Sequence, residues 1–521
     1  MNSSAQRIRR ILSYALPRTQ TTLRAAFAED RVLLICTALL LVAALIPLFL
    51  TTFLPFSDLG INTASADLLW DAARGHQPVA HFYKLASGPV PYWTSYLFCA
   101  VVGQVFGPLV AAKVLTAVIL ALVPLGTMRL LLALGRDPRL GLWAFLAIWE
   151  HNLYAGWEGM MLGVGLTFFV LAWLIEAETL SDGLRLVPYT ALIGLTHVHA
   201  TALLGVAGAA LALTRRPLGR RIALHAIALS GLLLAVAPWL LGKVVSSGGG
   251  PPQSFSFDWD SPAQKLSRLF EFTLDNFSHR DGERVAAVAF VLLILGPLIL
   301  GLLPARGVRH RFTAAVLVGA AGALYLFLPF AVGGPISHWY TYPRFASVVL
   351  VWLLLIPTPR LRGWPALALV PGVLVALALD VKVAEQFHAF ALQTRPFLEV
   401  IKQVPKGASV LPFTFDDGDS DPYLRLPPYH QFYAYITALT HGYSPYLWDN
   451  TSMPLNFRLE NKPPAPGWDG KFSLDEHGSH YDYLLVQGFE HQDPVAGATS
   501  SLGLHPTLVI QTARWRLYRV R

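Results

Sequence analysis

One polar stretch decides how this chain is organised: FLPFSDLGINTASADLLWDAARGHQPVAHFYKLASGPVP, from Phe53 to Pro91, which follows the first long apolar segment. It carries Asp58 directly after that segment, then a short amphipathic stretch, and then His81 and Lys84. An acid, an imidazole and an amine brought to one membrane surface by one loop indicate a functional site. The alternative from this stretch alone is a solvated loop in which Asp58 caps the helix that follows it.

The composition is that of a polytopic membrane protein. Of the 521 residues, 54% are hydrophobic and 14% are charged, whereas about 25% are charged in soluble domains. Apolar runs recur between Val32 and Leu379, and each is long enough to cross a bilayer core of about 30 Å. The net charge of +8 comes mainly from arginines between these runs, so it reports topology and does not indicate nucleic-acid binding. Cys36 and Cys99 lie in apolar segments, so no disulfide framework is expected.

The arginines also predict the orientation of the chain. Those before the first apolar run, Val32–Phe53, place the N-terminus in the cytoplasm, and we interpret that run as an uncleaved anchor. The loop with Asp58 then lies outside. The segment Pro89–Phe106 is ambiguous, but the later arginine clusters fall in the cytoplasm only if it does not cross the membrane. We therefore expect two periplasmic juxtamembrane helices, Ile61–Arg74 and Tyr92–Phe106. The later clusters are Arg136 and Arg139; Arg215, Arg216, Arg220 and Arg221; Arg306, Arg309 and Arg311; and Arg360 and Arg362.

The predicted fold is an all-α polytopic membrane domain over 1–380, followed by a small extracytoplasmic α/β domain over 381–521. About eleven helices are expected to span the membrane: the first run and segments 108–134, 140–154, 159–177, 184–196, 200–214, 222–244, 285–304, 312–332, 345–358 and 364–380. After Asp380 the periodicity predicts an amphipathic helix, two buried strands and a closing strand pair. These lie at 385–403, 408–413, 483–486, 507–511 and 515–520.

Ionisable side chains gather at the ends of spans on the outer face. Placing a charge there costs free energy, which suggests that these side chains have a function. The first loop gives Asp58, His81 and Lys84, and the later loops give Glu150, His151, Glu158, His197, His199, His338, Tyr342 and Arg344. Each has a structural alternative. Glu150 could pair with a nearby histidine, and His197 and His199 could line a cavity or hydrogen-bond between spans. Arg344 could bind a phosphate or pair with Glu150.

Short motifs extend this pattern. The YPRF motif, Tyr342–Phe345, precedes an apolar span, and DYLLV (482–486) and WRLYRV (515–520) lie in the predicted outer domain. With the acid of the first loop, the juxtamembrane helices and the acid of the second external loop, they resemble the GT-C superfamily. These are integral-membrane glycosyltransferases that use polyprenyl-phosphate-linked sugars, including the lipid A aminoarabinose transferases and the protein mannosyltransferases.

The resemblance implies an inverting sugar transfer from a polyprenyl-phosphate donor to an acceptor hydroxyl. Asp58 matches the general base, and Glu150 matches the acid of the second loop, with Glu158 as its competitor. Arg344 would hold the donor phosphate through its two-pronged guanidinium group, helped by Lys84, His81 and Tyr342. Substrate or metal contacts are open for His151, His197, His199, Glu158 and His338. No cofactor is required, although a divalent metal held by Glu150, His151, His197 and His199 is possible.

The resemblance further implies the partners and the location. The partners would be the lipid-linked donor, membrane lipids and an acceptor that is a glycan, a lipid or a protein, without nucleic acid. The chain would lie in the bacterial inner membrane, with a cytoplasmic N-terminus and a periplasmic C-terminal domain. Two other classes stay open: a lipid or sugar transporter or flippase, and a non-catalytic assembly factor. A transporter is expected to place ionisable residues at mid-membrane depth in repeated halves, whereas here they crowd one face and no repeat is visible.

Overall fold

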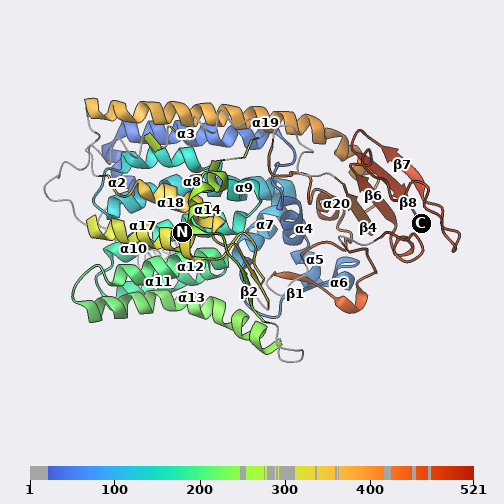
Figure 1. The fold of residues 1–521 in the computed structure, drawn as a ribbon, viewed down its shortest axis with the longest axis horizontal. Coiled ribbons are helices and arrows are strands. Elements are labelled where there is room, and N and C mark those ends of the chain that lie inside the picture. The colour runs from blue at the N-terminus through green and yellow to red at the C-terminus, as the bar shows by residue number, and fades with distance from the viewer. Residues whose placement is uncertain are drawn as a thin grey trace, which may run out of the picture.

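The computed structural model shows an elongated molecule with a helical body at one end and a strand-containing region at the other (Figure 1). It describes residues 22–246, 254–274, 276–277, 288, 291–292, 311–334, 337–357, 361, 363–415, 424–448, 453–467 and 471–520. The predicted span at 285–304 lies almost entirely outside the described residues, as do the arginines before Thr22.

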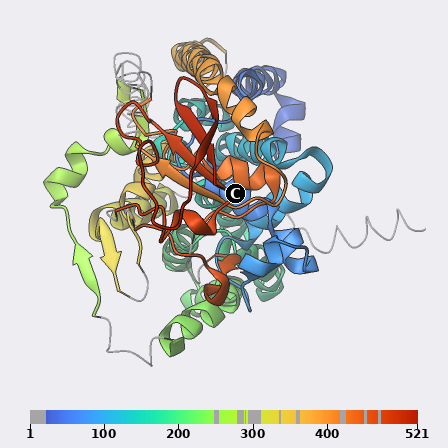
Figure 2. The same cartoon turned by 90° about the vertical axis from the view of Figure 1, so that its right-hand side faces the viewer.

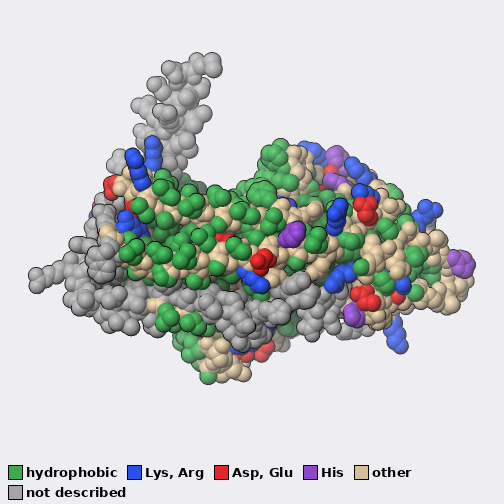
Figure 3. Space-filling view, turned by 90° about the horizontal axis from the view of Figure 1, so that it is seen from above, with side chains coloured by type: hydrophobic (Ala, Val, Ile, Leu, Met, Phe, Trp, Pro, Cys, Tyr) green, Lys and Arg blue, Asp and Glu red, His purple; other side chains and the backbone are tan. Residues whose placement is uncertain are grey.

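Five helices in the described part of the chain are long and apolar enough to cross a membrane. Several of them carry exposed leucine, valine and phenylalanine side chains on their outward faces, which a helix surrounded by lipid tolerates because no water contacts them. The helix Glu158–Glu176 exposes no large apolar side chain. Figure 3 shows such apolar side chains over the helical body, while the charged ones gather toward its two ends. The five are α3 (Arg31–Leu50), α8 (Pro108–Ala133), α10 (Glu158–Glu176), α13 (Leu218–Ser246) and α19 (Val370–Lys402).

Shorter helices complete the body. Three of them occupy positions where spans were predicted: α11 (Leu180–Gly194), α12 (Val198–Ala212) and α17 (Arg311–Phe327). The other short elements are α2 (Leu23–Glu29), α14 (Pro262–Ser267), α15 (Glu271–Leu274), η3 (Pro343–Phe345), α18 (Ala346–Leu353) and η4 (Trp364–Leu369). At the predicted span 345–358, α18 covers only eight residues, so the count of eleven spanning helices is not confirmed.

The predicted span at 140–154 is not a regular α-helix. It consists of the 3₁₀ helix η1 (Pro138–Ala147) and the single turn α9 (His151–Tyr154). A Cβ atom on Gly141 would lie 2.4 Å from Cγ of Met128 in α8, and the rest of η1 from Leu140 onward is buried. The segment is apolar because it packs inside the protein, which the sequence pattern alone does not distinguish from a span facing lipid.

The helix expected at 385–403 is not a separate element. It is the second half of α19, which runs without a break from Val370 to Lys402. In Figure 1 this helix extends along the whole body and reaches the strand-containing region. The apolar first half and the amphipathic second half are thus one rod, and the division into domains at residue 380 stays a prediction.

The loop that follows α3 is packed inside the molecule. Its helices are α4 (Leu59–Asp67), α5 (Leu69–Arg74) and α6 (Val79–Phe82), followed by α7 (Trp93–Phe106). Eight of the nine residues of α4 are buried, and a Cβ atom on Gly60 would lie 2.3 Å from the carbonyl oxygen of Gln431. We expected the stretch Ile61–Arg74 to lie in the membrane interface, but α4 instead packs against the C-terminal region, mainly its helix α20 (Ala434–Thr440).

The C-terminal region contains a four-stranded sheet in the order β4-β6-β8-β7. Strand β4 (Val410–Thr414) is parallel to β6 (Tyr483–Gln487), and β8 (Trp515–Arg519) is antiparallel to both β6 and β7 (Thr507–Gln511). All four predicted strands are therefore confirmed. Figure 2 views the molecule from this end. Two small pairs join distant parts of the chain: β1 (Tyr83–Leu85) with β5 (Leu455–Phe457), and β2 (Ser256–Asp258) with β3 (Ala331–Gly333).

The predicted topology can be tested with two single cysteines. Leu502→Cys lies in the C-terminal region at a side chain that is 65% exposed, and Gly219→Cys lies at the start of α13, where a Cβ atom meets nothing within 4 Å. With Cys36 and Cys99 replaced by alanine, an impermeant maleimide should label Leu502→Cys in intact spheroplasts and Gly219→Cys only after lysis. The opposite pattern would contradict the assignment of the outer side.

Candidate active site

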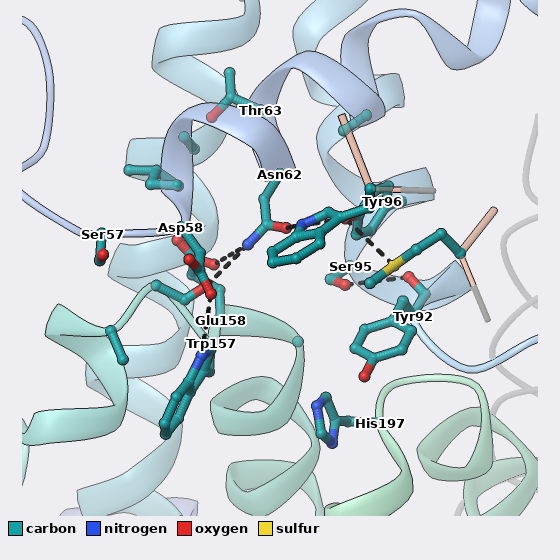
Figure 4. Close-up of a pocket in the computed structure, with 18 of the residues that line it drawn as sticks. Ser57, Asp58, Asn62, Thr63, Tyr92, Ser95, Tyr96, Trp157, Glu158 and His197 are labelled. Carbon is teal, nitrogen blue, oxygen red and sulfur yellow. Dashed lines mark hydrogen bonds between the residues drawn. The ribbon is translucent and has the colours of Figure 1, made fainter. Parts of the chain in front are cut away.

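A cavity of about 670 Å³ lies where the helical body meets the juxtamembrane helices and the C-terminal region. Its wall is built from α4, α7, the segment before α10, the start of α12 and the loop before η3 (Figure 4). Six predicted site residues line it: Asp58, His151, Glu158, His197, His338 and Arg344. The structure therefore brings together residues that are far apart in the sequence.

Trp157 connects the predicted acid and the predicted cation. Its indole Nε1 donates a hydrogen bond to Oδ2 of Asp58 at 3.2 Å. The guanidinium carbon of Arg344 lies 3.7 Å from the centroid of the same indole ring, a favourable cation–π contact. Trp157 thus keeps a carboxyl group and a guanidinium group in one site, and Asp58 and Arg344 form no ion pair in the described part of the chain.

The backbone around Asp58 explains how the acid is held. The N–H groups of Ser57 and Asp58 donate to the carbonyls of Tyr154 and Ala155 at 2.9 and 3.2 Å. Gly156 adopts φ +83°, and a Cβ atom there would lie 2.7 Å from the Asp58 nitrogen, so only glycine allows this close approach. The side chain of Asp58 makes no capping hydrogen bond to α4. The simple capping role considered for Asp58 is therefore wrong.

The protonation of Asp58 is set by its surroundings. The side chain is half-buried in the cavity wall. Burial raises the pKa of Asp58 to about 7, while the charge of Arg344 and the hydrogen bond from Trp157 lower it in part. A carboxyl group with a pKa near the working pH is suited to accept a proton.

Arg344 is buried and has no carboxylate partner among the described residues. Its Nη1 lies 3.3 Å from Nε2 of His197, its Nη2 donates to the Trp339 carbonyl at 3.4 Å, and its Nε has no hydrogen-bond partner. The alternative that Arg344 pairs with Glu150 is wrong in this structure. Burying a cation without an anion costs free energy. The guanidinium group of Arg344 is therefore available for an anionic ligand.

The acid of the second loop that faces the cavity is Glu158, not Glu150. Both oxygens of Glu150 accept from Nδ2 of Asn152, at 2.9 and 2.8 Å, and Glu150 is fully buried outside the cavity wall. Glu158 instead accepts from Nδ2 of Asn62 at 3.2 Å, and its second oxygen is buried without a partner. The catalytic role predicted for Glu150 is not supported by its position, because the turn of α9 directs it toward Asn152.

A polar network extends the site beyond the two acids. Oδ1 of Asn62 accepts hydrogen bonds from the Tyr96 hydroxyl at 2.9 Å and from the Trp448 indole at 3.3 Å. Figure 4 shows Asn62 between Glu158 and Tyr96. Asn62 was not among the predicted site residues, although it follows Asp58 by four positions and so lies on the same helical face. Trp157, Tyr96 and Lys243, which line the same cavity, were not predicted either.

The histidines have different positions. Nδ1 of His197 accepts from the backbone N–H of His199 at 3.1 Å and so caps α12, and the ring of His197 lies edge-on to Tyr92. His199 is buried but does not line the cavity, whereas His338 and His151 do. Burial lowers the pKa of His338 to about 4, as does the charge of Arg344, so His338 is neutral at pH 7. Within the described residues, no group of three or more histidine, cysteine or acidic side chains could hold a metal ion.

Three predicted phosphate ligands lie away from the cavity wall. Lys84 pairs with Asn456 in the β1–β5 ladder, and because strand side chains alternate, Tyr83 is buried while Lys84 points outward. His81 is also exposed, in α6. The Tyr342 hydroxyl donates to Asp260 at 2.6 Å, so Tyr342 supports the Arg344 segment from behind. These positions outside the cavity wall give no support to the phosphate-binding roles of Lys84, His81 and Tyr342, which stay predictions.

The fold has relatives among solved structures. It is similar to the crystal structure of ArnT from Cupriavidus metallidurans in the apo state, with TM-score 0.50 and 13% identity over 94% of this chain and 97% of that one. Arabinofuranosyltransferase AftD from Mycobacteria matches with TM-score 0.49 and 17% identity, over 94% of this chain and 40% of its own. No family model and no curated protein matches the sequence. The chain thus has a fold similar to that of ArnT, and its apolar helices are those of a multi-pass membrane protein. At such identities the likeness shows the fold alone.

Proposed function

We propose that this chain is a glycosyltransferase that moves a sugar from a polyprenyl-phosphate donor to an acceptor hydroxyl on the outer face of the membrane, with inversion at the anomeric carbon. The observation that carries the proposal is the arrangement at Trp157, whose indole donates to Asp58 and stacks under Arg344. A base and a phosphate-binding cation are the two groups that this reaction requires. The similarity of the fold to that of ArnT supports the same assignment.

In the proposed reaction the acceptor oxygen attacks the anomeric carbon from the face opposite the phosphate. The bond between that carbon and the phosphate oxygen breaks, and the lipid phosphate leaves with the electron pair. Asp58 takes the acceptor's proton, a contribution of about 10²–10⁴-fold. Arg344 stabilises the negative charge that develops on the phosphate. Glu158 and Asn62, whose polar atoms face the cavity, are placed to bind sugar hydroxyls.

The direct test uses purified protein in nanodiscs with a panel of polyprenyl-phosphate pentoses and hexoses. The proposal expects acceptor-dependent release of polyprenyl phosphate from at least one donor, with a product of inverted anomeric configuration. Tight binding of donors without any transfer, together with normal cell-envelope assembly in an Asp58→Asn strain, would favour the assembly-factor alternative. Accumulation of intact donor on the opposite leaflet would favour a flippase.

The pH dependence of kcat/KM is expected to follow the ionisation of Asp58. Because the pKa of Asp58 is raised to about 7, the carboxylate is scarce at lower pH, and kcat/KM should fall about tenfold per pH unit below the midpoint. Trp157→Phe keeps a ring under Arg344 but removes the N–H whose hydrogen bond favours the carboxylate. The midpoint should therefore move to higher pH in this variant. Identical profiles in both proteins would show that another group limits the rate.

A further inference from the structure

The antiparallel β2–β3 strand pair, whose strands are far apart in the sequence, exposes three aromatic side chains in a row. Phe255, Phe257 and Trp259 alternate along the outer strand, so they share one face. Their exposed fractions are 54%, 54% and 56%. The ring centroids are 6.2 Å apart between the phenylalanines and 6.3 Å apart between Phe257 and Trp259. Large aromatic side chains gathered on a surface mark an interaction site more often than an ordinary solvated face.

The β2–β3 strand pair is held at the end of an apolar helix. Strand β3 begins at Ala331, shortly after α17 ends at Phe327, which is 74% exposed. The Nζ of Lys265 donates to the carbonyls of Leu326 and Leu328 at 2.9 and 2.5 Å, which ties α14 to this helix end. The same Nζ lies 5.4 Å from the Trp259 ring centroid. The β2–β3 strand pair is thus fixed where the apolar surface of the helical body ends.

The loop that follows strand β3 forms part of the cavity wall. Val332 and His338 exchange two backbone hydrogen bonds of 2.8 Å, and the Thr341 N–H donates to the Phe330 carbonyl at 2.8 Å. His338, Trp339 and Tyr340 line the cavity. Strand β2, strand β3 and this loop are therefore three adjacent segments, the first exposing aromatic rings and the last facing the site. Figure 2 shows the two strands, light green and yellow, at the periphery of the molecule.

The chemistry of this face fits the interfacial layer of a lipid bilayer. Phenylalanine and tryptophan side chains are favoured at the headgroup boundary, where one end of the indole meets lipid and the other meets water. The nearest charges do not form a basic patch: Asp258 is exposed, and Arg268 pairs with Asp260 and Glu271. Attraction to anionic lipid is therefore not the main force, and insertion of the aromatic rings is.

We infer that the β2–β3 strand pair inserts Phe255, Phe257 and Trp259 into the bilayer interface and so places the rim of the cavity at headgroup depth. The occupant of this face is the phospholipid layer, continuous with the lipid that surrounds α17 and α13. A ligand with a lipid tail could then reach the cavity along the strand pair without leaving the membrane. This inference does not depend on the reaction proposed above.

The test measures membrane depth with a nitroxide label, so it needs no activity. Phe255→Cys and Phe257→Cys are labelled one at a time in the full chain with Cys36 and Cys99 replaced by alanine. The protein is reconstituted in vesicles of phosphatidylcholine alone or with added phosphatidylglycerol. Leu508→Cys on β7, an apolar side chain that is 46% exposed in the C-terminal sheet, is the matched control.

The expected result is that dissolved oxygen relaxes the labels at 255 and 257 more strongly than a water-soluble nickel complex does, with the reverse order at 508. The depth should be the same in both lipid mixtures, because aromatic insertion carries the binding. If the labels at 255 and 257 respond like the one at 508, the β2–β3 strand pair lies in water and the inference is wrong. If they are shielded from both reagents, protein covers the face, and the inference is also wrong.

Discussion

Asp58→Asn is expected to lower transfer by about 10²–10⁴-fold while leaving the protein folded and able to bind donor. The amide has the shape of the carboxyl group and can still accept the hydrogen bond from Trp157, but it cannot take a proton from the acceptor. The measurement is single-turnover transfer at saturating donor, at a pH about one unit above the midpoint. Asp71→Asn, which changes an acid of α5 outside the cavity wall, should keep transfer within a few-fold of the unmodified protein.

Stability gives an independent check on the same residue. Because the pKa of Asp58 is raised above its ordinary value of 3.8, the folded state binds this proton more tightly than the unfolded state does. The free energy of unfolding therefore falls as pH rises from about 4 through 7, and the loss is complete above 7. Asp58→Asn removes this dependence, so the variant should melt at a higher temperature than the unmodified protein at pH 8, with little difference at pH 4. If Asp58→Asn transfers sugar at close to the rate of the unmodified protein, Asp58 is not the base.

The sequence predicted those parts of the fold that depend on local pattern. Long apolar runs predicted α3, α8, α10 and α13, and two short buried runs with a closing strand pair predicted the four strands of the C-terminal sheet. It failed where tertiary packing overrides the pattern. The run at 140–154 is apolar because η1 packs tightly on α8, and nothing in its composition separates that from contact with lipid.

The residues of the candidate site also fall into two groups: those that the local sequence predicted, and those whose positions depend on tertiary contacts. Asp58, Glu158 and Arg344 were found because an ionisable group at the end of a span is costly and so stands out. Lys84 was misplaced because its direction is set by pairing with Asn456, far along the chain, which no local pattern contains. Trp157 was missed because its role comes from two tertiary contacts, one to Asp58 and one to Arg344. Only Asn62 had a local signal, its four-residue spacing from Asp58 on α4.

Arg344 gives the second large effect, because its surroundings separate a ligand-binding cation from a structural one. We expect Arg344→Ala to lower turnover by about 10²–10³-fold and to weaken donor binding, since the guanidinium group contacts the phosphate both before and during bond cleavage. Arg344→Lys keeps the charge but loses the fork and the stacking over Trp157, so it should recover only part of the activity. Donor binding and turnover are measured in parallel for both variants.

The structural alternative makes a different prediction, in which loss of Arg344 leaves Glu150 as a buried, unpaired charge. In the structure Glu150 is already bound by Asn152, and Arg344 is held by the Trp157 ring, His197 and a carbonyl. Removing Arg344 should therefore cost no more than the cation–π contact, about 0.5–2 kcal/mol, offset by the loss of a buried charge without an anion. Thermal unfolding of Arg344→Ala, Glu150→Gln and the double variant decides between the two roles. A stable but inactive Arg344→Ala protein supports phosphate binding, whereas an unstable one that Glu150→Gln restores, in both melting temperature and turnover, would show that Arg344 is structural.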